Sequence, residues 1–523
     1  MLAMDAAVDR SCYTCRNRRI QCDQTGVPCA KCTKAGLECF DKRPFRWVKG
    51  VAIRGRMQGV SYDGNKPAKS SANGQLAVVK TNATRRGQRK KSDTFDITTP
   101  LPFLMQDPSK YMLDQKSQYY VDYFNDRICK LFIVYDSDRN PFRGLIPLGY
   151  QDPVLMKALL ALAARHHVNT GQSFQLTELP AASSFQQANA NRDALSFKQQ
   201  AIEALTHALG DPIRSKKDTT VASIFLLIFL DLLESGSDGW NFHLEGAKNL
   251  IASTYLHPDC KASINDGPGQ TVQEIRKFIT KQLHFIETLG SAYLRPKLLS
   301  QDSKFDPQTM QCQESTESTE TSFLGCPEFL LTVIQSLSMQ RDGLAEAEWP
   351  LDPTTLQTHL KSTTSLVEAI RGFDSYAWAS NLKQSRQSSP QEIISLCNLS
   401  ESYKLGASLY ARRIISALNG ESTELDGLVT ELLGVIDSLK NDSAIFKCIL
   451  WPMFVAGLEC QWQAQRDFLV GCIEKFWDIT NCLNAVNAAK ALQEYWQKQD
   501  LAGESRPQWI FSIGSLGRDW LWV

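Results

Sequence analysis

C-Y-T-C-R-N-R-R-I-Q-C-D-Q-T-G-V-P-C-A-K-C-T-K-A-G-L-E-C is the stretch from residue 12 to residue 39, and it contains the spacing C-x2-C-x6-C twice. Two thiolates separated by two residues can bind one metal ion, and Zn2+ takes four ligands in a tetrahedron. Six thiolates can give two zinc ions four ligands each only if two sulfurs are shared. The spacing therefore predicts a binuclear cluster with two bridging cysteines, without selecting which two bridge. The predicted metal ligands are Cys12, Cys15, Cys22, Cys29, Cys32 and Cys39.

The two copies differ between their second and third cysteines. The first copy has R-N-R-R at residues 16–19, whereas the second has T-K-A-G-L-E at residues 33–38. We expect each stretch to form a short helix that is held at both ends by metal ligands. Only the first helix has a dense row of cations, so we expect that helix to contact a polyanion.

The cysteine spacing, the basic first helix and Pro28 in the connecting loop resemble the fungal binuclear zinc cluster, Zn(2)-Cys(6), family of transcription factors. The resemblance implies two zinc ions per chain, with Cys12 and Cys29 as the bridging ligands. It also implies that the first helix enters the major groove of double-stranded DNA and reads a short G/C-rich triplet such as CGG. Arg18 and Arg19 stand at the matching positions, and arginine can donate two hydrogen bonds to the O6 and N7 edge of guanine.

Further cations complete the predicted DNA contacts. Arg16 is next to a zinc ligand and is expected to bind a phosphate. The family often has a basic residue directly before the third cysteine, where this chain has Gln21, so the triplet or one phosphate contact stays open. The alternative is a charged face that is merely solvated. The predicted DNA-binding residues are Arg16, Arg18, Arg19, Lys31, Lys34, Arg46 and Lys49.

The positive charge continues beyond the cluster. Residues 42–56 resemble a stretch that follows the cluster in related fungal regulators, and its Phe45 and Trp47 either accompany phosphate contacts or pack back on the metal domain. A second basic run is typical of a nuclear localisation signal, with a solvated linker as the alternative. Its cations are Arg85, Arg86, Arg89, Lys90 and Lys91.

Net charge separates the chain into a basic head and an acidic body. Residues 1–92 contain 20 Lys and Arg against 6 Asp and Glu, and the remaining residues contain 37 against 50. This asymmetry indicates that contact with nucleic acid is confined to the N-terminal part. We expect residues 1–47 to be the DNA-binding domain, 48–97 a basic extension and flexible linker, and 98–523 a large regulatory domain.

The sequence shows neither a secretory signal nor a membrane span. Residues 1–10 contain two acids and no long apolar core. The longest apolar run, 221–230, is far shorter than the roughly 20 residues that cross a bilayer. We therefore expect a soluble intracellular protein, in which clustered cysteines bind metal rather than form disulfides. The remaining cysteines are scattered among apolar residues and are expected to act as small hydrophobes.

The body from residue 98 onward has helical periodicity and few strand signals, so we predict an all-α fold. Asp152 followed by Pro153 predicts a helix start. The motifs K-A-L-L-A-L-A-A-R-H at 157–166, W-x-x-H-L-x-G-A at 240–247 and W-P-M-F-V-A-G-L-E at 451–459 resemble the fungal-specific regulatory domain that accompanies such clusters. Helices are expected over 111–133, from Pro153 to about 167, and over 194–209, 219–234, 393–418, 428–439, 443–464 and 466–499, with a polar loop at 170–192. The aromatic tail is expected to dock on the body, with an exposed activation patch as the alternative.

These observations favour a nuclear, sequence-specific transcription factor of RNA polymerase II genes that works with transcriptional co-regulators. No apolar heptads follow the cluster, which leaves a monomer or a homodimer open. The alternatives are a zinc-stabilised interaction scaffold and an enzyme housed in the helical body. No catalytic motif supports an enzyme, and His243 beside Glu245 is better explained as a structural residue near a helix start.

Overall fold

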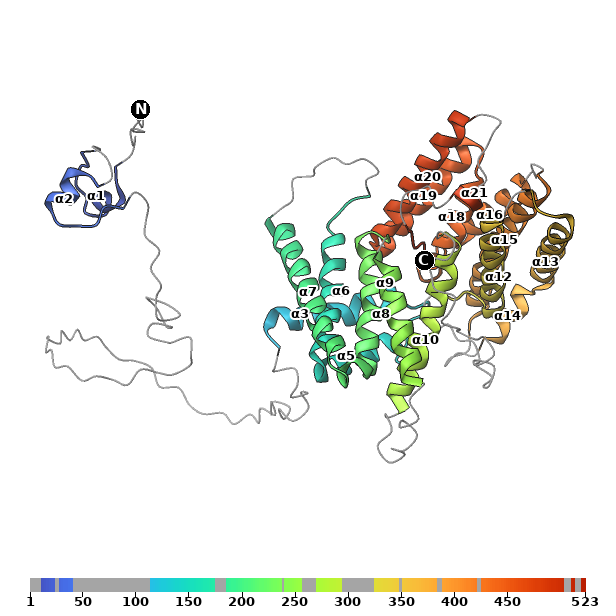
Figure 1. The fold of residues 1–523 in the computed structure, drawn as a ribbon, viewed down its shortest axis with the longest axis horizontal. Coiled ribbons are helices and arrows are strands. Elements are labelled where there is room, and N and C mark those ends of the chain that lie inside the picture. The colour runs from blue at the N-terminus through green and yellow to red at the C-terminus, as the bar shows by residue number, and fades with distance from the viewer. Residues whose placement is uncertain are drawn as a thin grey trace, which may run out of the picture. The chain divides into compact units, whose positions relative to one another are not determined.

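In a computed structural model, the chain divides into two compact units, Met1–Pro100 and Leu101–Val523. Figure 1 shows the short helices of the first unit and the many helices of the second. The predicted contacts Arg46 and Lys49 and the basic run at 85–91 lie outside the residues that the structure describes. The described residues are 11–23, 28–40, 113–174, 185–237, 239–255, 270–293, 324–347, 350–382, 388–420, 425–502, 509–512 and 519–523.

The first unit contains two short helices, α1 (Tyr13–Asn17) and α2 (Ala30–Lys34). Its buried side chains among the described residues are cysteines, whereas the apolar Ile20 and Leu37 are 37% and 43% exposed. The unit therefore has a core of sulfur rather than of hydrocarbon. Metal binding must supply most of its folding free energy, as in small zinc domains generally.

The second unit is helical, and its described residues form no strand, which confirms the all-α prediction. Figure 1 shows α5 to α10 on one side of this unit and α12 to α16 on the other. The helices are α3 (Gln115–Tyr123), the π-helical turn η3 (Phe124–Ile128), α4 (Cys129–Leu131), α5 (Pro141–Gln151), α6 (Pro153–Asn169), α7 (Phe185–Gly210), the 3-10 turn η4 (Arg214–Lys216), α8 (Asp218–Glu234), α9 (Trp240–Tyr255), α10 (Gln270–Ser291), α12 (Glu328–Glu346), α13 (Pro353–Gly372), α14 (Ser375–Asn381), α15 (Pro390–Asn419), α16 (Asp426–Leu439), α17 (Ser443–Phe446), α18 (Leu450–Glu459), α19 (Gln463–Thr480), α20 (Leu483–Ala502) and α21 (Trp509–Ser512).

Local sequence signals explain several helix starts. Asp152 caps α6 by accepting a hydrogen bond from the N–H of Val154 at 2.9 Å, and Pro153 occupies the first turn, as predicted. Ser389 and Glu392 form a reciprocal capping box at the start of α15. Each cap satisfies backbone groups that the first helical turn leaves without partners.

Two helices lie deepest in this unit. The apolar run 221–230 in α8 is buried throughout, and α8 contacts α6, α9, α10 and α20. Every residue of α18 is also buried, between α15, α16, α19 and α20. A helix that is apolar on all sides can be stable only at such a position, because no face of it suits water.

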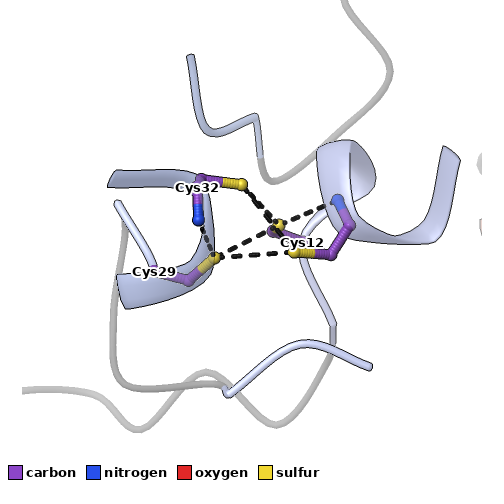
Figure 2. Close-up of side chains that lie close together, drawn as sticks. Cys12, Cys29 and Cys32 are labelled. Carbon is purple, nitrogen blue, oxygen red and sulfur yellow. Dashed lines mark hydrogen bonds between the residues drawn. The ribbon is translucent and has the colours of Figure 1, made fainter. Parts of the chain in front are cut away.

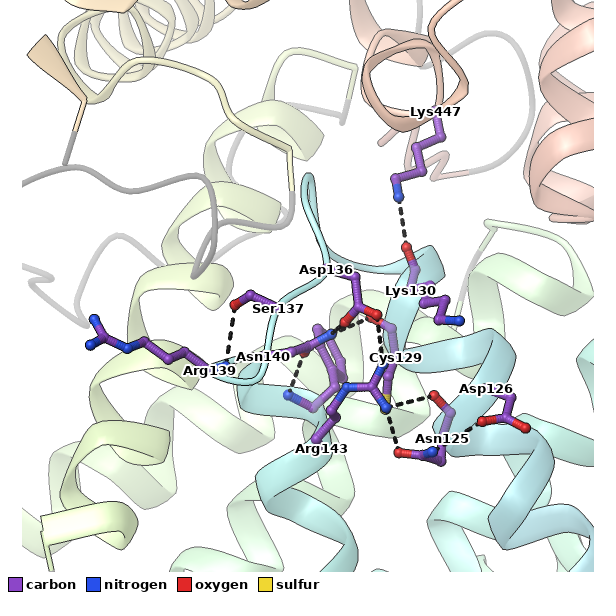
Figure 3. Close-up of polar contacts among 11 residues, drawn as sticks. Asn125, Asp126, Cys129, Lys130, Asp136, Ser137, Arg139, Asn140, Arg143 and Lys447 are labelled. Atoms are coloured by element: carbon purple, nitrogen blue, oxygen red, sulfur yellow. Dashed lines mark hydrogen bonds and ion pairs between the residues drawn. The ribbon is translucent and has the colours of Figure 1, made fainter. Parts of the chain in front are cut away.

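The helix predicted over residues 111–133 contains the π-helical turn η3, and side chains from distant segments hold its end (Figure 3). Arg143 donates to the carbonyl and side-chain oxygens of Asn125 at 3.2 and 2.6 Å. Lys447 donates to the carbonyl of Lys130 at 2.6 Å. A π turn and a helix end leave carbonyls without helical partners, and these cations satisfy them. The Lys447 contact ties the first helices of the body to the segment between α17 and α18.

Several predicted boundaries are wrong. Helix α7 begins at Phe185, inside the predicted loop, because Gln and Ala residues extend it readily. The helix predicted over 443–464 is split into α17 and α18. The helix predicted over 466–499 breaks at Asn481, which has a left-handed φ of 48° and caps α19.

The aromatic tail docks on the body, as predicted, since Trp509, Leu521 and Trp522 are buried. Trp240 donates its indole N–H to the carbonyl of Asp519 at 3.0 Å, and Leu521 donates its backbone N–H to Gly236 at 2.8 Å. Within the part of the chain that the structure describes, every helix is too short or too polar to cross a membrane.

Candidate metal centre and DNA-binding surface

Four cysteine sulfurs converge between α1 and α2. The Sγ of Cys12 lies 3.8 Å from the sulfurs of Cys29 and Cys32, and the Sγ of Cys15 lies 3.7 Å from both (Figure 2). Zn–S bonds of about 2.3 Å at tetrahedral angles place sulfurs about 3.8 Å apart. The sulfur spacing therefore fits zinc ligation.

The outer cysteines lie beside this group. Cys22 and Cys29 offer ligand atoms within 4.8 Å of each other, so Cys29 belongs both to this pair and to the group of four. Cys39 accepts a hydrogen bond from the N–H of Cys29 at 3.4 Å. Cys29 thus lies next to both outer cysteines, Cys22 and Cys39.

Each helix of the cluster begins directly after a cysteine. Cys12 and Cys29 have extended backbones, and their sulfurs accept the N–H of Cys15 at 3.3 Å and of Cys32 at 3.4 Å. These cysteines are N-caps as well as candidate ligands. The prediction that the helices run between the second and third cysteines of each copy is wrong, because α1 ends at Asn17, before most of that stretch.

Both helices end in the same turn. Arg19 has a φ of 57° and Gly36 a φ of 62°, both in the left-handed region. The N–H of Ile20 then reaches back to the carbonyl of Cys15 at 3.1 Å, and that of Leu37 to Cys32 at 3.0 Å. This is a Schellman-type cap, which usually has glycine at the left-handed position. Arg19 is a costly residue there, because its Cβ crowds the backbone.

The predicted DNA-binding residues within the described part of the unit are all exposed. Arg18 and Arg19 lie in the cap that follows α1 rather than on the helix itself. Lys31 and Lys34 lie on α2, and the ammonium of Lys31 donates to the carbonyl of Gln21 at 2.7 Å. Arg16 lies in the last turn of α1. The structure thus brings Arg16, Arg18 and Arg19 together around the end of one helix.

Residues that the sequence did not single out close the cluster. Thr14 donates its hydroxyl to the carbonyl of Glu38 at 2.8 Å and accepts the N–H of Phe40 at 3.1 Å. Tyr13 donates its N–H to the carbonyl of Phe40 at 2.6 Å. These bonds hold the end of the second half against α1. The 17-residue offset between the two cysteine patterns gives Thr14 and Lys31 equivalent positions in the two halves.

The electrostatics of the cysteines differ by position. Burial raises the pKa of Cys15 to about 12, together with the neighbouring thiols. The backbone N–H of Cys32 lowers the pKa of Cys29. Burial acts to raise the pKa of Cys12, but hydrogen bonds from the backbone and from neighbouring cysteines lower it overall. A buried group that includes thiolates needs cations among its sulfurs, which zinc ions would provide.

The described residues of the helical body contain no comparable centre. Across the part of the chain that the structure describes, the groups of His, Cys, Asp and Glu that could hold a metal ion all lie in the cluster. His243 lies in the first turn of α9, with its Nε2 3.7 Å from the Oδ2 of Asp231. Burial lowers the pKa of His243 and raises that of Asp231 to about 7. Glu245 pairs with the buried ammonium of Lys248 at 3.2 Å. His243 and Glu245 therefore have separate partners, in agreement with a structural role.

Comparisons with known proteins cover both units. The family model described as the fungal Zn(2)-Cys(6) binuclear cluster domain matches residues 10–47, and the model described as the fungal specific transcription factor domain matches residues 118–522. One curated relative is the acriflavine sensitivity control protein acr-2 of Neurospora crassa, which is 24% identical over 99% of this chain and 95% of its own length. No solved structure matches the chain.

Proposed function

The chain belongs to the fungal transcription factors that combine a Zn(2)-Cys(6) cluster with a fungal specific transcription factor domain, and we propose that it reads a short G/C-rich triplet such as CGG at RNA polymerase II genes. It is a zinc-binding transcription factor. Its triplet, its base contacts and its place of action are the proposal. Zinc would hold the fold, and the side chains around the first helix would select the DNA.

The observation that carries this proposal is the position of Arg19. Its backbone is left-handed where the second half has Gly36. A non-glycine residue in this region costs of order 1–3 kcal/mol and persists where the side chain is needed. The turn presents Arg19 beside Arg18 at the exposed end of α1, where both guanidinium groups are free to enter a groove. Two such contacts with guanine would account for a G/C-rich preference.

The remaining cations are proposed as phosphate contacts. Arg16 and Lys34 are exposed on the two helices, and Arg46 and Lys49 continue the basic sequence beyond the cluster. Phosphate contacts position a protein on DNA without specifying sequence. The basic run at 85–91 is proposed to direct the chain to the nucleus.

Two zinc ions per chain are proposed, with Cys12 and Cys29 as the shared ligands. Each is an N-cap, and each has two sulfurs of the other half within 3.8 Å. Cys15 and Cys22 would complete one site, and Cys32 and Cys39 the other, which requires the sulfurs of Cys15 and Cys32, 3.7 Å apart in this structure, to separate onto different ions. When bound, zinc supplies structural cross-links between thiolates and no reaction chemistry.

The helical body is proposed to regulate transcription through co-regulators, and not to act as an enzyme. In its ion pairs, such as Lys198 with Glu234 and Arg466 with Asp500, each charged side chain is neutralised by its partner. A homodimer and a monomer are both compatible with the proposal.

Selection from a pool of random duplexes with the full-length, zinc-loaded protein tests the proposed function. We expect enrichment of a G/C-rich triplet. Arg19→Ala should lower affinity for the selected site while leaving binding to random DNA much less affected. Arg139→Ala, which removes an exposed cation from the body, is the matched control and should change neither. If the wild-type protein selects no duplex, the zinc-stabilised scaffold becomes the better explanation.

A further inference from the structure

Two reciprocal hydrogen bonds join the halves of the metal cluster. Thr14 donates its hydroxyl to the carbonyl of Glu38 at 2.8 Å, and Lys31 donates its ammonium to the carbonyl of Gln21 at 2.7 Å. Thr14 and Lys31 each precede the second cysteine of their own half. Glu38 and Gln21 each precede the third cysteine of the other half. Both bonds therefore connect equivalent positions.

The backbone confirms that the halves are equivalent at these positions. The N-caps Cys12 and Cys29 have ψ angles of 152° and 151°. The left-handed residues Arg19 and Gly36 follow the two helices at the same distance. Equivalent residues of the two halves are 17 positions apart, as Cys12 and Cys29 are. The Thr14 and Lys31 bonds start and end at equivalent positions, so we infer that they have the same structural function, although a hydroxyl donates one and an ammonium the other.

The carbonyl that Lys31 binds lies at the end of the segment with the exposed arginines. This segment runs from Arg18 to Gln21, and within it the N–H of Ile20 donates to the carbonyl of Cys15 at 3.1 Å. At its end, Gln21 is held by Lys31 and followed by the ligand Cys22. Arg18 and Arg19 lie at the beginning of this short segment, which leaves the helix in a left-handed turn. Loss of the Lys31 bond would release the far end of the segment.

We propose that Lys31 is a positioning residue for DNA reading, which acts through the Gln21 carbonyl on Arg18 and Arg19 rather than by neutralising a phosphate. This inference rests on the proposed reading of bases by these arginines. Gln21 then acts through its backbone carbonyl, which Lys31 of the second half binds, and not through its side chain. A basic side chain directly before Cys22 is then not required to hold the segment.

Salt dependence separates positioning from phosphate contact. Removal of one phosphate contact lowers the slope of log K against log salt concentration by about one unit, because one fewer counterion is released. Removal of a positioning residue leaves this slope unchanged and lowers affinity for the specific site alone. We expect Lys31→Met, which keeps the length of the side chain but not its donor or its charge, to weaken specific binding about tenfold at an unchanged slope.

Three further variants and one measurement complete the experiment in the full-length, zinc-loaded protein. Lys31→Arg keeps a donor and should restore most of the specific affinity. Lys34→Met removes the other lysine of α2 and should lower the slope while weakening specific and random binding equally. Thr33→Val, which alters α2 without removing charge, should change neither. Zinc content is measured for each variant, because a loss of zinc would weaken specific and random binding together.

The outcomes distinguish the inference from the proposed function. If wild type selects a site and Lys31→Met lowers the slope by about one unit with equal loss on random DNA, Lys31 is a phosphate contact and the inference is wrong. Unchanged affinity in Lys31→Met also overturns it, as does the loss of zinc by that variant. If wild type selects no site, the proposed function fails, whatever the variants do.

Discussion

The two halves of the metal cluster have the same backbone and different chemistry. Each begins with an N-capping cysteine, continues as a five-residue helix and ends in a left-handed turn. The first half has Arg19 in that turn, where the second has Gly36. The second half is built with the residue that suits the conformation, whereas the first tolerates a strained one. Ligand spacing thus determines the fold of both halves, and the side chains between the ligands determine which half can contact DNA.

Zinc removal should erase this difference and has the largest expected effect. The sulfurs of Cys12 and Cys15 in the first half lie within 3.8 Å of those of Cys29 and Cys32 in the second, so both halves contribute to one group of ligands. Chelation should unfold residues 11–40 and abolish DNA binding, while the helical body keeps its melting temperature because its core is apolar. Hydrogen exchange at the equivalent amides of Ile20 and Leu37 measures both halves. Protection that persists at one of them would show that the halves fold separately.

Arg19→Gly exchanges the turn of the first half for that of the second. A bidentate contact with guanine contributes about 1–3 kcal/mol, so affinity for the selected DNA site should fall about 5- to 150-fold. The cluster should become more stable by about 1 kcal/mol, because the left-handed strain is relieved. Competition with a zinc chelator measures stability, and titration with the selected duplex measures affinity. Arg19→Asn is the control, since asparagine tolerates the turn but lacks the guanidinium. Retention of affinity within twofold would contradict a base-reading role.

Thr14→Val removes the bond that is the counterpart of the Lys31 bond. The variant loses the donor to Glu38 and the acceptor for Phe40, and we expect a cost of about 1–2 kcal/mol in cluster stability. Thr33→Val is the matched control, because the Thr33 hydroxyl donates only within its own helix turn, to the carbonyl of Cys29 at 3.1 Å. Chelator competition compares the two. Equal stability of both variants would argue against a joining role for Thr14.

Gly36→Ala tests the turn of the second half and has the smallest expected effect. A Cβ at this position would meet no atom within 4 Å, so the cost arises from the left-handed φ alone and should be about 1 kcal/mol. Gly36→Asn should cost less. Neither should change the DNA sequence that is selected, since the second half does not read it. A change in the selected triplet would show that both halves contact bases.

Local patterns predicted much of the fold. The helix that starts at Asp152 and Pro153, the buried run in α8 and the docked aromatic tail are confirmed. The break at Asn481 was missed because its left-handed cap lies within a continuous helical pattern. The π turn before Cys129 was missed for a related reason, since Arg143, from elsewhere in the chain, satisfies the carbonyl of Asn125 in this turn.

The metal ligands of the candidate site were predictable from the sequence, whereas the hydrogen bonds between the two halves of the cluster were not. Cysteine spacing identifies the metal-binding residues because the metal requires few and regular distances. Lys31 was predicted from its charge as a DNA contact, but its bond to Gln21 spans ten residues and depends on the folded cluster. Charge alone does not distinguish a lysine that binds phosphate from one that binds a carbonyl.

By itself, the sequence determined the paired cysteine patterns, the basic head on an acidic body and the helical character of that body. These properties follow from ligand spacing, net charge and periodicity, which are local or additive along the chain. Only the tertiary structure decided that Arg19 takes a left-handed backbone and that Thr14 and Lys31 join the two halves. It also decided that the tail pairs with Gly236. Such features depend on which distant groups remain unsatisfied after the helices form, and only the folded chain brings those groups together.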